Sequence, residues 1–189
     1  MDTILITGGT GLIGTSLTKA LTEKGYKVII LTRNVEKNKP LKNVTYASWN
    51  VEKQYIDPEA IKKSQYIIHL AGENVASKKW TEERKKEILE SRIKAGSLLI
   101  KALKDIPNNI KAVVSASAIG WYGSDPQIPN PKPFVETLLP SQDFLGRTCE
   151  QWESSIMPVN NLGKRLVILR TGIVLSNDGG AYTEFKKTL

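Results

Sequence analysis

The chain has 189 residues, 40% hydrophobic and 24% charged, a size and composition typical of a globular protein with one core. Its single cysteine and single histidine, Cys149 and His69, exclude an internal disulfide and leave too few ligands for a cysteine- or histidine-rich metal site, so we expect no metal. The net charge of +8 comes from lysine pairs interleaved with glutamate, and no apolar run is long enough to span a membrane, which indicates a cytoplasmic protein without nucleic-acid or membrane partners.

A glycine-rich segment lies between the first two predicted elements. The apolar run at residues 3–6 predicts a strand, and an amphipathic pattern from Ile13 predicts a helix. Gly8 then permits a tight turn, Gly11 lets the main chain approach a pyrophosphate, and Gly14 lets the helix pack closely. The alternative is a glycine-rich turn without a ligand. The predicted phosphate-binding residues are Gly8, Thr10, Gly11, Leu12, Ile13 and Gly14.

The second predicted strand, residues 27–32, selects the cofactor. Its near-continuous apolar run indicates burial on both faces, and it ends at Thr32 and Arg33. In folds where a glycine-rich turn between a strand and a helix binds a dinucleotide, an acid at the end of the second strand binds the ribose of NAD, whereas an arginine there accommodates the 2′-phosphate of NADP. The first acid here is Glu36, so the sequence favours NADP (NADPH) over NAD, with Thr32 and Arg33 as contacts. The alternative for Arg33 is an ordinary exposed loop residue.

Four more strand patterns follow, at residues 44–46, 66–70, 112–117 and 165–170. Their alternation with helices predicts an α/β fold, a Rossmann-like doubly wound parallel sheet with strand order 3-2-1-4-5-6. We expect His69, inside a strand, to be packed rather than catalytic. Small or polar residues at the strand ends would face the ligand crevice. They complete the predicted cofactor site as Leu70, Ala71, Gly72, Ser115 and Thr171.

Two long helices are predicted between these strands. One covers residues 81–104 with Thr81 as its N-cap, and the other covers 142–157 with Ser141 as its N-cap. Cys149 lies on the apolar face of the second helix, so we expect a buried thiol with a raised pKa. A short helix is predicted after Asp57. Five of the nine prolines lie between residues 123 and 140, which we interpret as a stiff surface loop rather than an interdomain linker.

Several motifs resemble those of the atypical short-chain dehydrogenase/reductases, and more narrowly the epimerase family proteins related to the NAD-dependent epimerase/dehydratases. They are Thr7-Gly8-x-x-Gly11-x-x-Gly14, Leu70-Ala71-Gly72-Glu73-Asn74, Ser115-Ala116-Ser117-Ala118, Tyr122-Gly123 and Arg170-Thr171-Gly172. The resemblance implies an NADP-binding Rossmann domain over residues 1–172. Residues 173–189 would begin a truncated substrate-binding lobe, with most of that smaller C-terminal lobe absent. It also implies a homodimer built on the two long helices, whose faces could equally pack on the sheet.

The resemblance also indicates the proton machinery. Ordinary short-chain dehydrogenases use a serine, a tyrosine and a lysine four residues after the tyrosine. The family pattern places Leu145 at the tyrosine and Cys149 at the lysine, so the usual pair is absent. Ser117 matches the upstream serine, Arg92 falls where many relatives have asparagine, and Tyr122 is the phenol closest in sequence to Ser117. The candidate catalytic residues are therefore Ser117, Cys149, Tyr122 and Arg92. Glu136 is a further proton carrier, and Asn74, Trp80 and Trp121 are candidates for the substrate mouth.

These features lead to two hypotheses of different classes. The first is an NADP(H)-dependent oxidoreductase or epimerase that acts on a small carbonyl or sugar-like substrate. The second, motivated by the missing tyrosine and lysine, is a non-catalytic NADP(H)-binding redox sensor or interaction protein.

Overall fold

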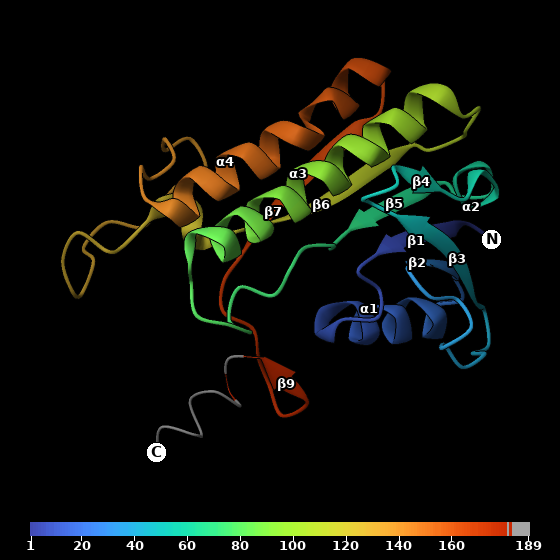
Figure 1. Ribbon diagram of the computed structural model, residues 1–189, viewed down its shortest axis with the longest axis horizontal. Coiled ribbons are helices and arrows are strands. Elements are labelled where there is room, and N and C mark those ends of the chain that lie inside the picture. Colours follow the sequence, from blue (N-terminus) through green and yellow to red (C-terminus); the bar gives the residue numbers. More distant parts are fainter. Residues whose placement is uncertain (181, 183–189) are drawn as a thin grey trace.

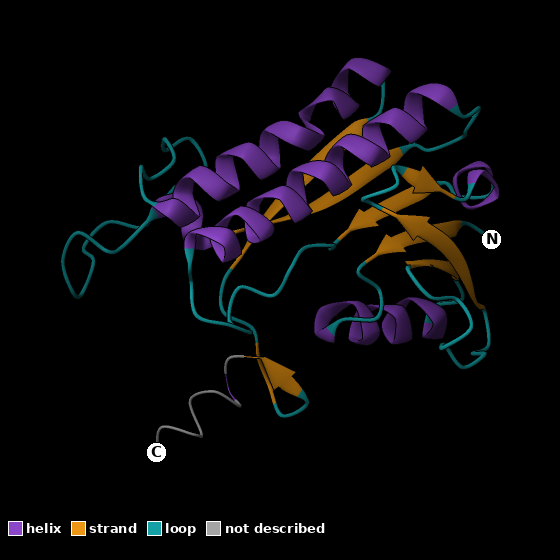
Figure 2. Ribbon diagram, in the orientation of Figure 1, coloured by secondary structure: helices purple, strands orange, loops and turns teal. Residues whose placement is uncertain are grey.

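Residues 1–180 and residue 182 are described in the computed structural model, and their elements form three layers (Figures 1 and 2). A central sheet carries α1 (Leu12–Glu23) on one face, and α3 (Glu82–Asp105) and α4 (Phe144–Ile156) side by side on the other. This arrangement is the predicted doubly wound, Rossmann-like α/β fold.

The main sheet has seven strands in the order β4-β3-β2-β1-β5-β6-β7. The strands are β1 (Thr3–Thr7), β2 (Lys27–Thr32), β3 (Val44–Asn50), β4 (Tyr55–Ile56), β5 (Tyr66–His69), β6 (Ala112–Ala118) and β7 (Arg165–Thr171), with β8 (Leu175–Ser176) and β9 (Gly179–Gly180) forming a separate antiparallel pair. All pairings in the main sheet except β3 with β4 are parallel. The six parallel strands therefore follow the predicted order 3-2-1-4-5-6.

One edge of the sheet differs from the prediction. The third strand continues to Asn50 rather than ending near residue 46, and β4 pairs with it antiparallel through Trp49 and Ile56. Both of these side chains are buried. A two-residue strand is too short to show any periodicity, and polar residues interrupt the second half of β3, so the pattern did not reveal this edge.

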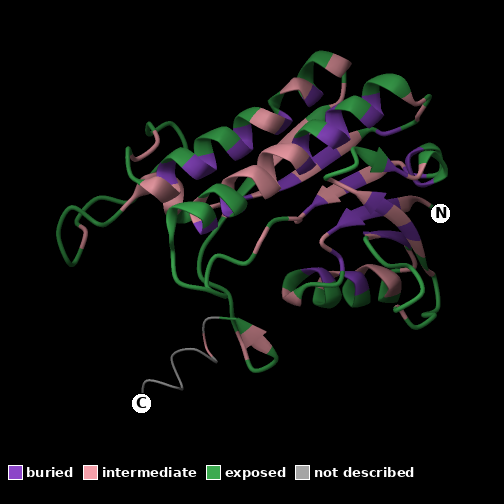
Figure 3. Cartoon of the chain, viewed as in Figure 1, coloured by how far each residue is buried: buried purple, intermediate pink, exposed green. Residues whose placement is uncertain are grey.

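The hydrophobic core is divided between the two faces of the sheet. In β2, Val28 and Ile30 belong to the cluster beneath α1, while Ile29 and Leu31 belong to the cluster beneath α3 and α4. Figure 3 shows buried residues concentrated in the central strands and on the helix faces that turn toward them. Burial on both faces explains why β2 is a continuous apolar run.

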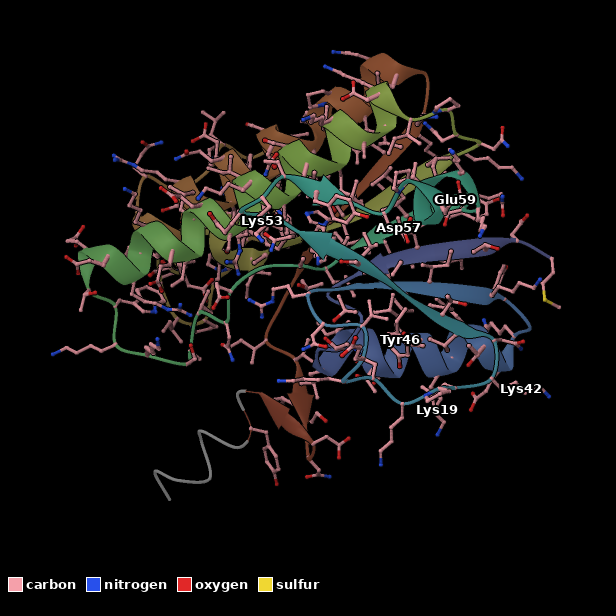
Figure 4. The ribbon with its side chains drawn as sticks, turned by 45° about the vertical axis from the view of Figure 1, so that its right-hand side comes forward. Lys19, Lys42, Tyr46, Lys53, Asp57 and Glu59 are labelled. Carbon is pink, nitrogen blue, oxygen red and sulfur yellow. The ribbon has the colours of Figure 1, made fainter. Side chains whose placement is uncertain are left out.

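Side chains cap three of the helices. Asp57 caps α2 (Pro58–Lys62) by accepting a hydrogen bond of 2.9 Å from the Glu59 N–H; both residues are labelled in Figure 4. Thr81 caps α3, as predicted. The predicted cap of α4 is wrong, because Asp143 rather than Ser141 accepts the first-turn hydrogen bond, at 2.7 Å. Ser141 lies two residues before this cap, and its N–H donates to the main-chain oxygen of Trp121 at 2.7 Å.

The proline-rich segment is a loop, as predicted. It connects the short 3-10 helix η1 (Ile119–Tyr122) to α4 and projects away from the sheet at the end where both meet (Figure 1). A second 3-10 helix, η2 (Met157–Leu162), leads from α4 into β7. Among the described residues, no helix combines the length and apolar character that a bilayer crossing requires.

Candidate functional site

The glycine turn is built as the sequence predicts, with one addition. Gly8 has φ +69°, and a Cβ added there would lie 2.9 Å from the main-chain carbon of Leu70. Gly14 is buried, and a Cβ added there would collide with the main chain of Gly8 and Gly9. The close packing that Gly14 allows is therefore between α1 and the turn before it, next to the end of β5.

Gly9 is a requirement that the motif spacing did not reveal. A Cβ at Gly9 would lie 2.8 Å from Cγ2 of Ile30, a buried side chain of β2. The only signal was that Gly9 stands beside Gly8. The turn is consequently pressed against β2 as well as β5.

The N-terminus of α1 is open to an anion. Its N-cap is Gly11, which has no side chain to accept a hydrogen bond, and its first turn holds no acid. The first N–H groups of a helix have no acceptor within the helix, and they carry partial positive charge. A Cβ at Gly11 would meet only the Gly8 oxygen, at 3.3 Å, and otherwise open space. This glycine cradle fits the pyrophosphate of a dinucleotide.

The exposed face of α1 also differs from the predicted one. Gly14 and Thr18 are the buried residues of the helix, while Ile13 is 41% exposed. The amphipathic pattern predicted Ile13 on the inner face. Close packing at Gly14 turns the helix so that Ile13 remains at the surface beside the glycine turn.

Arg33 stands where β2 ends. The preceding Thr32 accepts a hydrogen bond from the Asn34 N–H at 3.3 Å, which closes a local turn. Within residues 1–180, the Arg33 side chain has neither a hydrogen-bond partner nor a carboxylate partner. The exposed guanidinium can therefore pair with a phosphate without first breaking an ion pair.

Thr7 joins the ends of β1 and β5. Its hydroxyl accepts hydrogen bonds from the N–H groups of Leu70 and Ala71, at 3.1 and 3.2 Å, and lies 2.7 Å from Nδ1 of His69. His69 is fully buried, which confirms the prediction of a packed histidine, and burial lowers its pKa to about 4, with a further contribution from the Arg92 charge. Thr7 stands in the glycine motif, but its hydroxyl contacts with β5 cannot be read from the motif.

Arg92 holds the loop that follows β5. It donates to the main-chain oxygens of Glu73 and Ile88 at 3.1 and 2.8 Å, and it lies over the Trp152 ring at 4.9 Å. Burial lowers its pKa. A Cβ at Gly72 would approach the guanidinium carbon to 3.0 Å, so Gly72 is needed for this contact. The structure thus places Arg92, a candidate catalytic residue, in contacts with main chain and core.

Arg84 is a second clamp on the same loop, and no sequence motif pointed to it. It is buried, it contacts the Glu73 carboxylate at 3.3 Å, and it donates to the main-chain oxygen of Asn74 at 2.7 Å. The nearby Trp80, a candidate for the substrate mouth, donates from its ring nitrogen to the Val75 oxygen at 2.6 Å. The loop after β5 is therefore fixed in shape by residues of α3 and by its own contacts.

The candidate proton-handling residues on β6 and α4 are largely enclosed. Ser117 is 1% exposed, and its hydroxyl donates to the Glu153 carboxylate of α4 at 2.6 Å. Cys149 is 3% exposed, and burial raises its pKa, which confirms the prediction of a buried thiol. Leu145 packs on Gly120, where an added Cβ would lie 3.0 Å from the leucine Cβ. Leu145 carries no titratable group, and the Cys149 thiol donates to the main-chain oxygen of Ala118 at 3.6 Å.

Arg170, at the end of β7, connects these elements. It makes two hydrogen bonds to the Glu153 carboxylate, at 2.9 and 3.0 Å, and a third, at 3.2 Å, to the Tyr122 hydroxyl. It also donates to the main-chain oxygen of Glu136 at 3.1 Å and covers the Trp121 ring at 3.6 Å. Sequence reasoning assigned no role to Glu153 or Arg170. The structure brings Ser117 and Tyr122 into one network with them, while Arg92 contributes to a different cluster.

Two other predicted contacts use their hydroxyl protons internally. Ser115 is buried and donates to the Ala116 oxygen at 3.2 Å, and Thr171 donates to the Ser117 oxygen at 3.0 Å. A hollow of about 310 Å³ does exist between α3 and α4, but it is lined by outer residues such as Lys85, Phe144 and Gln151, and by none of the predicted cofactor contacts. The predicted cofactor contacts lie instead at the carboxyl edge of the sheet, where β1, β2 and β5 end.

Comparison with known proteins agrees with this geometry. Residues 4–143 match the NAD dependent epimerase/dehydratase family. The chain is 35% identical to the epimerase family protein YfhF of Bacillus subtilis, with 93% of this chain and 56% of YfhF aligned. It is also 35% identical to the epimerase family protein SSP1921 of Staphylococcus saprophyticus, with 98% of this chain and 60% of that protein aligned. The chain thus spans little more than half the length of these relatives.

Solved structures give the same picture. A nucleoside-diphosphate sugar epimerase from Corynebacterium glutamicum superposes with a TM-score of 0.78 at 30% identity, over 98% of this chain and 37% of that one. The human epimerase family protein SDR39U1 (isoform 2), solved with NADPH, superposes with a TM-score of 0.77 at 28% identity, over 98% of this chain and 58% of that one. With the glycine cradle, the strand order and these relatives in agreement, the chain belongs to the NAD dependent epimerase/dehydratase family.

Proposed function

We propose that this chain is the NADP(H)-binding part of an oxidoreductase- or epimerase-type protein that acts on a small carbonyl or sugar-like substrate. The observation that carries the proposal is the uncapped, glycine-edged N-terminus of α1, beside the end of β5, with Arg33 beyond the end of β2, a side chain that no other described residue pairs with. NADPH in the human relative and the nucleoside-diphosphate sugar activity named for the C. glutamicum relative support it.

The roles of the cofactor contacts follow from their positions. The N–H groups of Leu12 and Ile13 would bind the pyrophosphate, and Arg33 would bind the 2′-phosphate. The Leu70–Gly72 segment, held against Gly8 by Thr7, would follow the cofactor across the sheet edge. A nicotinamide cofactor supplies or accepts the hydride, and the protein has to orient the substrate oxygen beside it.

Calorimetry of the full-length protein with NADPH and NADH tests the cofactor assignment. We expect NADPH to bind more tightly, because Glu36 is the first acid after β2 and Arg33 has no competing partner in the part of the chain that the structure describes. Binding of neither dinucleotide would contradict the whole proposal. Tighter binding of NADH would contradict the NADP assignment alone.

The enclosed residues after β6 favour a second candidate function, a non-catalytic NADP(H)-binding redox sensor. Leu145 and Cys149 replace the usual tyrosine and lysine. Leu145 packs against Gly120 of η1, and Cys149 is buried. A sensor would bind NADPH and show no change in nicotinamide absorbance with carbonyl compounds or nucleotide sugars. Turnover of any of these substrates would favour the enzyme.

A further inference from the structure

For each hydroxyl group on β6, η1 and β7, the hydrogen bonds show whether its proton is already donated within the protein. Four residues in these elements carry a hydroxyl: Ser115, Ser117, Tyr122 and Thr171. A hydroxyl has a single proton to donate. Ser115 and Thr171 donate to main-chain oxygens at 3.2 and 3.0 Å, and Ser117 donates to the Glu153 carboxylate at 2.6 Å. Three of the four protons are therefore already engaged within the protein.

Tyr122 is the exception. Its hydroxyl lies 3.2 Å from Nη1 of Arg170. A guanidinium has donors and no acceptor, so the phenol oxygen must be the acceptor in this hydrogen bond. Within the described part of the chain, no acceptor is found for the proton of Tyr122. This proton remains available to a ligand at the carboxyl edge of the sheet.

Arg170 is held in a single position while it donates to Tyr122. The Glu153 carboxylate binds its Nε and Nη2 at 2.9 and 3.0 Å, and the Trp121 ring lies 3.6 Å from its guanidinium carbon. A paired carboxylate and guanidinium in this bidentate geometry have little rotational freedom. The phenol oxygen of Tyr122 is thereby fixed next to the strand ends.

The aromatic ring of Tyr122 is fixed as well. It stacks on Phe134 of the proline-rich loop, with ring centroids 5.0 Å apart. Arg170 ties the same loop to β7 through the main-chain oxygen of Glu136 at 3.1 Å. Ring stacking and the hydrogen bond from Arg170 together limit the direction in which the phenol proton can point.

We propose that Tyr122 donates the hydrogen bond that orients the substrate's carbonyl or hydroxyl oxygen, and that Arg170, held by Glu153, is its positioning residue. The inference rests on the proposed function, because it assumes that a substrate binds beside the cofactor at this edge. The inference assigns the substrate-orienting hydroxyl to Tyr122 rather than to Ser117, because the Ser117 hydroxyl already donates its hydrogen bond to Glu153.

The test uses the full-length protein with tyrosine carbon-13 labelled at Cζ, and NADP⁺ with cyclohexanone as the probe. Cyclohexanone is a ring-sized ketone that oxidised cofactor cannot reduce, so the complex does not react. The resonance of Tyr122 is assigned by its loss in Tyr122→Phe. Tyr55, half exposed on β4 at the far edge of the sheet, is assigned in the same way with Tyr55→Phe and serves as the control.

We expect cyclohexanone to shift the Tyr122 resonance and to leave that of Tyr55 in place. Tyr122→Phe should weaken cyclohexanone binding by about 3- to 10-fold, the loss of one hydrogen bond, with NADP⁺ affinity kept within about twofold. Arg170→Met should abolish the shift, and Arg170→Lys should restore part of it, which a purely structural role for the arginine would not produce.

An unmoved Tyr122 resonance at the highest soluble ketone concentration overturns the inference, as does unchanged ketone affinity in Tyr122→Phe. Tyr122→Phe decides the question if the Arg170 variants do not fold. The two proposals fail in distinguishable ways. NADP⁺ binding is measured by tryptophan fluorescence. Absence of binding contradicts the proposed function itself, whereas bound NADP⁺ with an unchanged Tyr122 resonance contradicts only this inference.

Discussion

The hydroxyl oxygen of Thr7 lies 2.7 Å from Nδ1 of His69, where β1 and β5 end side by side. The same hydroxyl oxygen accepts from the main-chain N–H groups of Leu70 and Ala71, at 3.1 and 3.2 Å. One threonine side chain thus holds a buried histidine and the start of the loop after β5 against the end of β1.

This burial predicts a specific pH dependence of stability. The His69 pKa is lowered from its usual 6.5 to about 4 in the folded protein, so the unfolded chain binds the extra proton first as pH falls. The contribution is fully present above pH 6.5 and is lost as pH falls toward 4, by up to about 3 kcal/mol in the free energy of unfolding. Urea denaturation across this range measures it. In His69→Gln the free energy of unfolding should depend less on pH between 6.5 and 4. An equal pH dependence in the variant and the wild type would contradict the assignment of this effect to His69.

Arg33→Ala tests the cofactor preference at a single side chain. Loss of a charged hydrogen-bond pair with the 2′-phosphate should weaken NADPH binding by about 10- to 100-fold and leave NADH binding unchanged. Arg165, exposed at the start of β7 on the opposite edge of the sheet, provides the matched control Arg165→Ala. Fluorescence titration gives both affinities. An equal loss for the two dinucleotides would mean that Arg33 does not read the 2′-phosphate.

Gly9→Ala tests the packing of the turn against β2. A methyl group there would stand 2.8 Å from Ile30, and forcing extra volume into a packed site costs about 1–3 kcal/mol. Gly172→Ala is the control, because its added Cβ would meet only Ile119 at 3.9 Å. Thermal and urea unfolding of both variants provide the comparison. Equal stability of Gly9→Ala and Gly172→Ala would show that the turn can move away from Ile30.

Asp143→Ala tests the observed start of α4. Removing a side-chain cap should destabilise the protein by about 1 kcal/mol, because the Gly146 N–H loses its acceptor. Ser141→Ala removes only a 3.4 Å contact to the Asp143 N–H and should cost less. The two free energies of unfolding, measured by urea denaturation, decide between the caps. A larger loss in Ser141→Ala would return the cap to the residue that the sequence indicated.

Local patterns predicted most elements and missed those that depend on distant partners. Thr81 and Asp57 were assignable as caps because a cap acts within three residues of itself. The prediction of Ser141 as a cap was wrong because Asp143, two residues later, also fits the N-cap pattern, and in the folded chain the Ser141 N–H donates to the main-chain oxygen of Trp121. The inner face of α1 was displaced by one residue for a similar reason, since contact of Gly14 with the turn determines the rotation of the helix.

The amino-acid sequence by itself determined the order of the parallel strands, the glycine turn and the absence of the usual tyrosine and lysine, because these depend on periodicity, backbone freedom and residue identity. Only the tertiary structure decided which hydroxyl groups already donate a hydrogen bond within the protein and which can donate one to a ligand. Ser117, Glu153, Arg170 and Tyr122 come from β6, α4, β7 and η1, and their hydrogen bonds span 17 to 48 residues of chain. No local pattern encodes such contacts, since they exist only after the sheet and its helices have packed together.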